Sequence, residues 1–228
     1  MRKFLVFLIF LLVVLVAADR GLHYAAQSEI AKRVSQQYEM VGDPEVTIGG
    51  FPFLNQAVSG EYSEIHIVTG AMTVGEVQLE RVDATLNDVR APLDELMSEP
   101  NIVAGTANAT VMLPYSELQK RLPEGLVIET ENGTPRITGD IAYQGFSVGI
   151  ESDIGIDVDG GTVMVTPSNI SVGDAPIPTS WIEDQLAIAF EMPPLPFDLQ
   201  LTGIKALPNG VQATAEGTDV QITGGGPQ

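Results

Sequence analysis

The hydrophobic and polar positions change pattern along the chain, beginning with an apolar run. Phe4 to Ala18 contains fifteen uncharged, apolar residues and has no polar face. Arg2 and Lys3 precede this run, and Asp19-Arg20 follows it. Two positive charges before a short apolar stretch are typical of a segment that inserts with its N-terminus in the cytoplasm. The pattern therefore predicts that the rest of the chain is exported across the cytoplasmic membrane.

Two fates of this segment, residues 1–18, fit the sequence. As a helix, Phe4 to Ala18 spans about 22 Å, which is shorter than a hydrocarbon core of about 30 Å. Val16-Ala17-Ala18 also offers the small residues that signal peptidase requires before its cleavage site. We expect either a signal peptide cleaved after Ala18 or a retained membrane anchor.

Residues 19–41 have the pattern of an amphipathic helix. Apolar residues recur every four positions, while the polar residues lie largely elsewhere on the helix. The apolar positions are Leu22, Ala26, Ile30, Val34 and Tyr38. Gly42-Asp43-Pro44 predicts the end of this helix. His23 lies at its membrane end, where an interfacial polar role fits better than metal or proton chemistry.

From Val46 onward the period changes to two, which is the alternation of half-buried β-strands. Pairs of apolar residues that follow it are Val46/Ile48, Ile65/Ile67, Val77/Leu79, Val111/Leu113 and Val163/Val165. Turn sequences separate the strands, because Asn, Asp and Gly tolerate positive φ. They are Asn132-Gly133, Asp159-Gly160-Gly161 and Pro208-Asn209-Gly210.

The alternation changes phase at Gly145-Phe146 and again between Leu79 and Val82. One extra residue exchanges the two faces of a strand, so a bulge explains each change. Ile137 to Val158 is also too long for a flat strand without a bend or a tight turn. We predict an α+β fold dominated by a long, curved antiparallel sheet over residues 42–223, followed by a disordered tail, residues 224–228.

Three short helices should interrupt the sheet. Their signals are an initiating proline, an apolar face or a capping box in which Ser180 and Glu183 satisfy each other's backbone amides. The predicted ranges are Ala91–Ser98, Pro114–Leu122 and Ser180–Glu191, the last with Ile182, Leu186 and Phe190 as its apolar stripe. Pro193-Pro194-Leu195-Pro196 ends the third helix.

Composition narrows the classes of partner. The chain carries 30 acidic and 11 basic residues, for a net charge of −19. Nucleic-acid binding requires a basic face, so that class is excluded. The same charge argues against electrostatic attachment to anionic lipid headgroups, so lipid capture would have to use apolar surface. The chain has no cysteine, which excludes disulfides, thiolate zinc sites, a thiol nucleophile and an acylated N-terminal cysteine.

Catalytic and metal motifs are weak. Gly145-Phe146-Ser147-Val148-Gly149 matches the G-x-S-x-G elbow of α/β hydrolases, which requires a strand-to-helix turn and a later histidine. Strand alternation continues past Ser147, and both histidines, His23 and His66, precede it. Asp153, Asp157 and Asp159 suggest calcium, but they share one face of a strand, where solvation explains them. We predict no catalytic residue, no metal site and no cofactor.

Two stretches together resemble one protein family. The first is Gly49-Gly50-Phe51-Pro52-Phe53-Leu54, followed by Ser59-Gly60-Glu61-Tyr62. The second is Met192-Pro193-Pro194-Leu195-Pro196-Phe197, followed by Leu201-Thr202-Gly203-Ile204 and Pro208-Asn209-Gly210-Val211. With the hydrophobic segment and helix in front, residues 20–223 resemble the LmeA-like family of actinobacterial cell-envelope proteins. The family pattern often has glycine after Leu-Pro-Phe, where this chain has Asp198.

The resemblance implies a fold akin to tubular lipid-binding domains, in which a long curved sheet wraps an apolar groove. It also implies phospholipid binding in the envelope and a link to the maturation of mannose-containing lipoglycans. For the mouth of the groove we expect large apolar side chains held on stiff, proline-containing loops. They are Phe51, Phe53, Leu54, Leu195 and Phe197. Ordinary core packing explains each of them equally well.

The expected function is that of an exported, non-enzymatic phospholipid-binding protein. It would act on the extracytoplasmic face of the cytoplasmic membrane, either anchored there or released into the periplasm-like space, with a phospholipid or related envelope lipid as its partner. The alternative is a membrane-tethered structural or interaction module with a closed core and no lipid ligand. The two differ physically, because a lipid carrier needs an apolar cavity that holds acyl chains.

Overall fold

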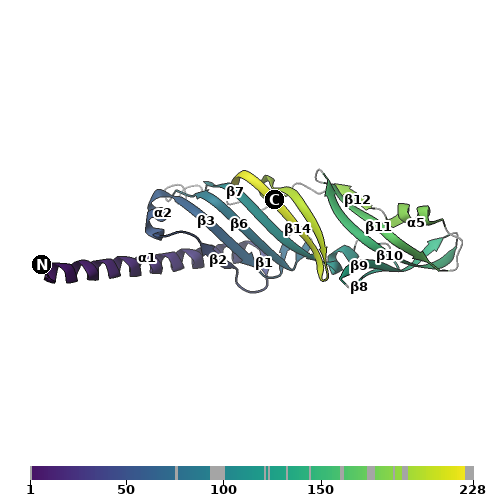
Figure 1. The fold of residues 1–228 in the computed structure, drawn as a ribbon, viewed down its shortest axis with the longest axis horizontal. Coiled ribbons are helices and arrows are strands. Elements are labelled where there is room, and N and C mark those ends of the chain that lie inside the picture. The colour runs from purple at the N-terminus through teal and green to yellow at the C-terminus, as the bar shows by residue number, and fades with distance from the viewer. Residues whose placement is uncertain are drawn as a thin grey trace. The chain divides into compact units, whose positions relative to one another are not determined.

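The computed structural model divides the chain into two compact units. Unit 1 comprises Met1–Gly70, Asp83–Asn108 and Gly217–Gln228, and unit 2 comprises Ala71–Val82 and Ala109–Glu216. The structure describes residues 2–74, 77–92, 101–120, 122, 124–131, 133–143, 145–159, 162–173, 178–186, 188–191 and 195–223. Strands predominate and helices are few (Figure 1), which confirms the predicted β-dominated α+β class with antiparallel sheets.

One continuous helix, α1 (Arg2–Gln37), contains both the apolar run and most of the predicted amphipathic segment. By length and composition it could cross a membrane. Its half-buried positions include Ala26, Ile30 and Val34, as the spacing predicts, whereas Leu22 is 51% exposed. The helix ends at Gln37, before the predicted Gly42-Asp43-Pro44 signal, and the short strand β1 (Glu39–Met40) follows.

The main element of unit 1 is a β-sheet, and the helix α1 packs against its strand β2. Its strands lie in the order β14-β7-β6-β3-β2. Their bounds are β2 (Glu45–Ile48), β3 (Glu61–Thr69), β6 (Arg81–Arg90), β7 (Asn101–Pro114) and β14 (Gly210–Thr223), of which the last three extend into unit 2. β2 and β3 are antiparallel, with Ile48 opposite Ile65, and both side chains are buried. A short helix, α2 (Phe53–Ser59), connects these two strands.

Unit 2 contains an antiparallel sheet in the order β12-β11-β10-β9-β8. These strands are β8 (Leu126–Glu131), β9 (Thr134–Tyr143), β10 (Phe146–Asp159), β11 (Thr162–Val172) and β12 (Ile188–Glu191). Its smaller elements are β4 (Met72–Val74), β5 (Val77–Leu79), α4 (Tyr115–Gln119), the 3-10 turn η1 (Pro196–Asp198) and β13 (Gln200–Leu207). β13 pairs antiparallel with β14, with Leu207 opposite Gly210, so Pro208-Asn209 is the predicted hairpin turn.

The phase change at Gly145-Phe146 is a hairpin turn, and the predicted bulge is absent there. Tyr143 pairs with Phe146 across the turn, and Gly145 has φ +89°. In this register each odd-numbered residue of β9 pairs with an even-numbered residue of β10. The buried side chains therefore have odd numbers in β9 and even numbers in β10, which explains the change of phase. A bulge does occur further along β10, where its register with β11 shifts between Glu151 and Asp153.

The third predicted helix is shorter than Ser180–Glu191. α5 covers Thr179–Leu186, and Ile188–Glu191 form the edge strand β12. Phe190 pairs with Val163 in that strand, so it leaves the predicted helical stripe. Pairing with β11 satisfies the backbone hydrogen bonds of β12, and this tertiary gain overrides the helical spacing.

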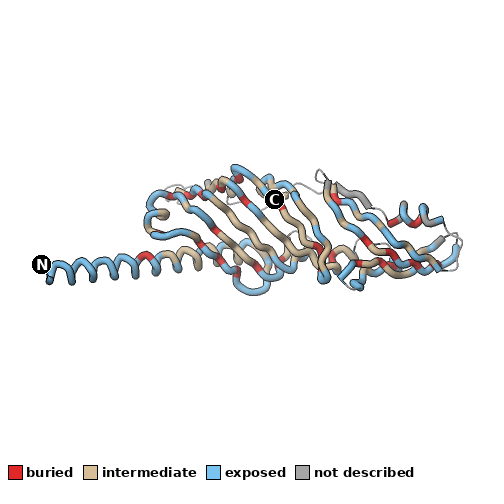
Figure 2. The backbone as a smooth tube through the Cα atoms, in the orientation of Figure 1, coloured by how far each residue is buried: buried red, intermediate tan, exposed pale blue. Residues whose placement is uncertain are grey.

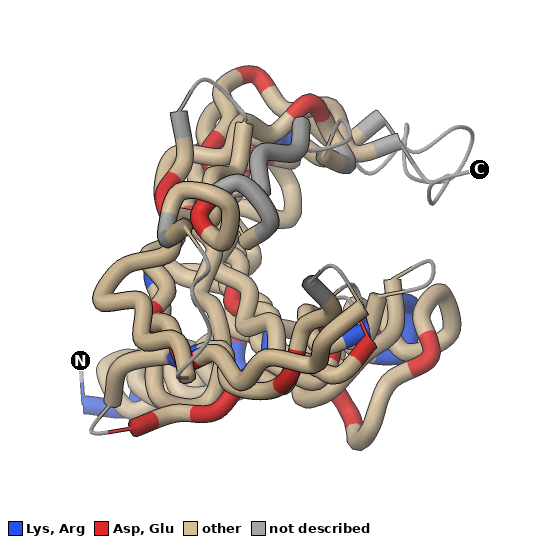
Figure 3. Tube along the Cα trace, turned by 90° about the vertical axis from the view of Figure 1, so that its right-hand side faces the viewer, with Lys and Arg blue, Asp and Glu red and all other residues tan. Residues whose placement is uncertain are grey.

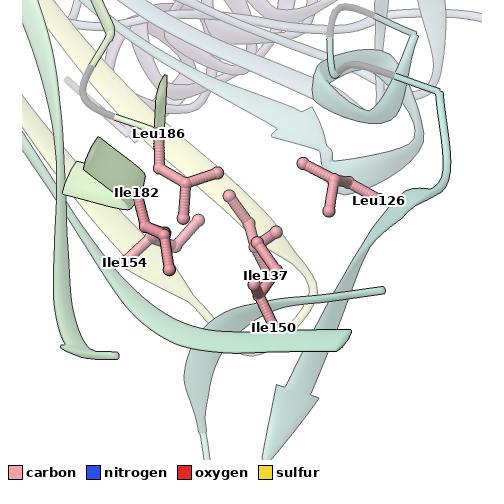
Figure 4. Packing of buried hydrophobic residues seen from close by; sticks show 6 residues of the cluster. All are labelled: Leu126, Ile137, Ile150, Ile154, Ile182 and Leu186. Carbon is pink, nitrogen blue, oxygen red and sulfur yellow. The ribbon is translucent and has the colours of Figure 1, made fainter. Parts of the chain in front are cut away.

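The buried core of unit 2 lies between α5 and the sheet. Ile182 and Leu186 of α5 point toward side chains of β8, β9 and β10 (Figure 4). The cluster consists of Leu126, Ile137, Ile150, Ile154, Ile182 and Leu186, each at most 5% exposed. Buried positions are also scattered along the strands of unit 1, whereas the apolar half of α1 is exposed (Figure 2).

Some predictions fall outside the described residues. They concern residues 93–98 of the first short helix, the tail at 224–228, the turn residues Asn132, Gly160 and Gly161, and the prolines at 193 and 194. The second short helix, α4, covers Tyr115–Gln119 and is confirmed over that part of its predicted range.

Candidate functional site

The glycine pair before Phe51 forms a turn that is held against β3. Gly49 donates its N–H to the Glu64 carbonyl at 2.8 Å. Gly50 has φ +88°, and a Cβ at this position would lie 2.7 Å from Nε2 of Gln56. The Gln56 amide donates to the Gly49 carbonyl at 2.9 Å and accepts from Ser63 N–H at 3.0 Å. Glycine and Gln56 therefore position the loop that begins at Phe51.

The three predicted site residues of this loop have different environments. Phe51 is 64% exposed and projects from the loop just before α2. Phe53 is buried at 5% exposure, with its ring centroid 5.3 Å from that of His23 and 6.3 Å from that of Tyr62. Leu54 is half-buried. Phe53 is thus a core side chain in this structure, while Phe51 is free to contact a ligand or a surface.

α1 holds this loop through residues that directly follow its apolar run. The buried carboxylate of Asp19 accepts the Leu54 N–H at 2.8 Å. This bond caps the N-terminus of α2, whose own N-cap residue, Pro52, offers no side-chain cap. One turn later, His23 donates from Nε2–H to the Ile48 carbonyl at 2.8 Å. His23 therefore has a structural hydrogen-bonding role, and its place at a membrane interface stays a prediction.

Arg20 links the same two elements. Its Nη2 lies 3.1 Å from Oδ2 of Asp19, and its guanidinium carbon lies 4.8 Å from the ring centroid of Phe51. A guanidinium at that distance over an aromatic face is attracted by the ring quadrupole. The two charges that end the apolar run thus contact each other and the Phe51 loop.

A cleft of about 670 Å³ opens beside Phe51 within unit 1. The cleft is open to solvent, and its volume lies within the range of small-molecule sites. Its walls mix apolar side chains with amides, carboxylates and one guanidinium, that of Arg90. They are formed by Gly50, Phe51, Pro52, Asn55, Gln56, Glu61, Tyr62, Ser63, Asp88, Val89, Arg90, Val103, Gly105 and Asp219. Such a lining suits an amphiphilic molecule better than a purely apolar one.

Gly105 forms part of one wall of the cleft. A Cβ added at this position of β7 would lie 3.0 Å from the Cβ of Asp88 on the neighbouring strand. Val103, two residues earlier on β7, is half-buried and also lines the cleft. Gly105 therefore lets β7 and β6 approach closely at the wall of the cleft. Acidic residues outnumber basic ones in both units (Figure 3), and three of the cleft residues are acidic.

The other two predicted site residues, Leu195 and Phe197, belong to unit 2 and are half-buried. The structure therefore places them in a different unit from Phe51. Phe197 has φ +62° and Asp198 has φ +55°. A left-handed residue favours glycine, and aspartate is among the few others that tolerate it. This conformation explains how Asp198 can replace the glycine that often follows Leu-Pro-Phe.

The catalytic and metal alternatives find no assembled site in the part of the chain that the structure describes. Ser147 is exposed on β10 opposite Ala142, and strand continues after it in place of the helix that an elbow needs. His66 lies in unit 1, with Nε2 2.8 Å from Asp83. Asp153 bonds Arg136 and Asn169, and the described residues contain no cluster of three or more metal-ligating side chains.

Comparison with known proteins decides the family. The model of the LmeA-like phospholipid-binding family matches residues 17–216. The chain belongs to this family. No match was found among curated proteins or among solved structures. The LmeA-like match begins two residues before Asp19, so it includes the part of α1 that holds the Phe51 loop.

Sequence reasoning found the Phe51 loop of this LmeA-like chain but missed the residues that position it. Asp19 and Arg20 marked only the end of the apolar run, and Gln56 carried no signal. The Asp19–Leu54 bond joins positions 35 residues apart, which no local periodicity encodes. The unusual placement of a carboxylate within a helix, directly after an apolar run, was the one available hint.

Proposed function

We propose that this protein binds phospholipid without catalysis, on the extracytoplasmic side of the cytoplasmic membrane, with α1 retained as its anchor. Membership of a phospholipid-binding family supports the lipid ligand. The cleft beside Phe51 is the observation that supports the place of binding. Supply of lipid to envelope-lipid or lipoglycan maturation is the role that the family resemblance implies.

The chemistry of the cleft fits a lipid headgroup and the first part of its chains. Phe51, Pro52 and Val103 offer apolar contact, and each buried methylene contributes roughly 0.8 kcal/mol. Arg90 is the basic residue of the lining and suits a phosphate. The carboxylates nearby disfavour headgroups with net negative charge, so affinity should depend on acyl length and only weakly on salt.

The contacts of Asp19 and His23 support a retained anchor. Both residues lie within α1 and bond the segment from Ile48 to Leu54. Cleavage after Ala18 would make Asp19 the terminal residue and remove the preceding helical turns that hold it in place. Residues at a helix end lose intrahelical hydrogen bonds and fray. Cleavage at this site would therefore weaken the cap on α2.

The alternative function, an interaction module with a closed core, has support in unit 2. There Ile182 and Leu186 of α5 already fill the apolar face of the sheet. An acyl chain on that face would have to displace α5. This packing is the reason that we place the ligand in the cleft of unit 1.

The test is the lipid content of the full chain, expressed in its native host and measured by native mass spectrometry. Val103→Trp should reduce bound phospholipid several-fold, because the larger indole at this lining position takes up part of the cleft volume. Val127→Trp is the matched control, since Val127 is an exposed strand valine of unit 2. It should leave the lipid content unchanged.

Two results would contradict the proposal. A folded, monodisperse wild-type protein that carries no lipid and takes none from vesicles would favour the interaction module. Lipid that persists in Val103→Trp at the level of Val127→Trp would remove the ligand from this cleft.

A further inference from the structure

We propose that the Phe51 loop and its neighbours insert into the membrane interface, so that unit 1 is seated directly on the outer surface of the bilayer. The surface consists of Leu22, Tyr24, Phe51 and Val58, with Arg20 among them; we call it the seating surface. The proposal rests on the retention of α1 in the membrane, as proposed above.

The seating surface is apolar and exposed although it belongs to a folded unit. Phe51 is 64% exposed, Val58 82%, Leu22 51% and Tyr24 75%. α2, which carries Val58, lies at the end of unit 1 from which the apolar half of α1 projects (Figure 1). The Arg20–Phe51 contact places Phe51 beside the helix just after the apolar run ends. Leu22 and Tyr24 therefore follow the candidate membrane span on the same helix, and the contact with Arg20 brings Phe51 next to them.

Helix length favours a membrane boundary at this surface. Phe4 to Ala18 alone is about 22 Å long, which is short of a hydrocarbon core of about 30 Å. Extending the immersed segment to Tyr24 lengthens it to about 31 Å. A membrane that closes this mismatch would cover the helix up to the level of the Phe51 loop.

Two charges would ordinarily oppose this immersion, because Asp19 and Arg20 fall inside the longer segment. In this structure they neutralise each other at 3.1 Å. Asp19 is buried by the protein and bonded to Leu54 N–H, while Arg20 lies over the ring of Phe51. Arginine and tyrosine side chains also reach from apolar surroundings to the headgroup layer. Unit 1 itself therefore lowers the cost of placing these residues at the interface.

The seating has a consequence for the ligand. Phe51 belongs both to the seating surface and to the lining of the cleft, and the next residue, Pro52, also lines the cleft. A cleft whose rim contacts the bilayer receives a phospholipid without exposing its chains to water. The geometry thus assigns the membrane itself as the source of the lipid.

The absence of cysteine from the chain makes the test simple, because one introduced cysteine is a unique labelling position. Phe51→Cys and Phe146→Cys would carry the same nitroxide label on the full chain in phosphatidylcholine vesicles. Phe146 is the matched control: it is a phenylalanine of unit 2 at a hairpin turn, and it is 72% exposed. Collision of the label with oxygen, which concentrates in hydrocarbon, is compared with collision with a water-soluble nickel complex.

The label at position 51 should collide several-fold more with oxygen than with the nickel complex, and the label at 146 should show the reverse. Equal access of the nickel complex to both labels would overturn the seating. Shielding of position 51 from both reagents would also overturn it, because a protein partner or a second copy would then cover Phe51. A water-exposed label at 51 in protein that still binds lipid would refute the seating alone and leave the cleft standing.

Discussion

Asp153 joins three neighbouring strands of unit 2 through its two carboxylate oxygens. On one side it accepts from Nε of Arg136 on β9 at 2.9 Å, and on the other from Nδ2 of Asn169 on β11 at 2.8 Å. Arg136 also contacts Glu131 and Glu151. The hydrogen bond from Asn169 and then that from Arg136 hold the pKa of Asp153 below its usual range. The spacing of the acidic residues suggests calcium, but Arg136 and Asn169 are the partners of the Asp153 carboxylate in this structure.

Asp153→Ala should therefore lower the melting temperature of unit 2 by a few degrees at neutral pH. The folded-state pKa lies below the unfolded value, so the stabilisation is present above about pH 4 and is lost as the pH falls through the folded value. The difference between wild type and variant should therefore narrow progressively as the pH falls below about 4. Fluorescence of Trp181, the single tryptophan, follows the transition because it packs against the core of unit 2.

Asp157→Ala is the control, because Asp157 is exposed on the same strand. It should leave the melting temperature nearly unchanged at every pH. An equal loss in both variants at neutral pH, or a gap for Asp153→Ala that does not narrow as the pH is lowered below about 4, would show that the network does not stabilise the fold as described.

At the scale of elements, β8 and β9 approach each other more closely than side chains allow. Gly139 on β9 has φ +139°, and a Cβ there would lie 2.0 Å from the Gly125 carbonyl oxygen. Gly125 has φ +93°, and its own Cβ would lie 2.7 Å from the Asp140 carbonyl oxygen. The Gly125 oxygen also accepts the Asp140 N–H at 3.1 Å. The start of β8 thus depends on Gly139, which pairs with Leu126, and on Gly125, whose carbonyl lies against Gly139.

Gly139→Ala should cost roughly 2 to 4 kcal/mol of unfolding free energy, because backbone must move to admit the methyl group. Gly149→Ala is the matched control on β10, where the nearest atom to an added Cβ is Oδ1 of Asp140 at 3.7 Å. It should change the unfolding free energy by less than about 0.5 kcal/mol. Urea denaturation followed by Trp181 fluorescence measures both, and similar values for the two variants would refute the close-approach argument.

At the scale of the whole molecule, we expect the apolar part of α1 to lie in a membrane and the strongly acidic body to lie in water. Arg2 and Lys3 precede the apolar run, and the body carries most of the 30 acidic residues. Basic residues before a span favour the cytoplasmic side, so the body is expected outside. The bonds of Asp19 and His23 to the loop from Ile48 to Leu54 then tie the anchor to unit 1.

A reporter that is active only outside the cytoplasm, fused after Gln228, should therefore work. The intact mass of the protein from its native membrane should include residues 1–18, because α1 is retained. A reporter that is active only in the cytoplasm serves as the control at the same site. Strong activity of that control would reverse the topology, and a mass lacking residues 1–18 would refute the anchor.

The sequence predicted which loop belongs to the candidate site, but it did not predict which side chains of that loop are exposed. The motif from Gly49 to Leu54 identified the loop and the family. It did not separate Phe51 from Phe53, because two residues of equal hydrophobicity on either side of Pro52 give the same local signal. Their different exposure depends on α1, whose His23 covers the ring of Phe53 and whose Arg20 lies over Phe51.

The sequence by itself determined the apolar run, the alternation of the strands and the hairpin at Pro208-Asn209, because each depends on neighbouring residues and on backbone preferences. Tertiary structure decided the rest. It made Gly145 part of a hairpin turn, since only strand pairing distinguishes a turn from a bulge. It placed Ile188–Glu191 in the strand β12, because pairing with the edge of β11 satisfies the backbone N–H and C=O groups that a helix would otherwise have paired. It also made Asp19 the cap of a helix 35 residues away, a hydrogen bond that exists only once α1 and α2 lie side by side.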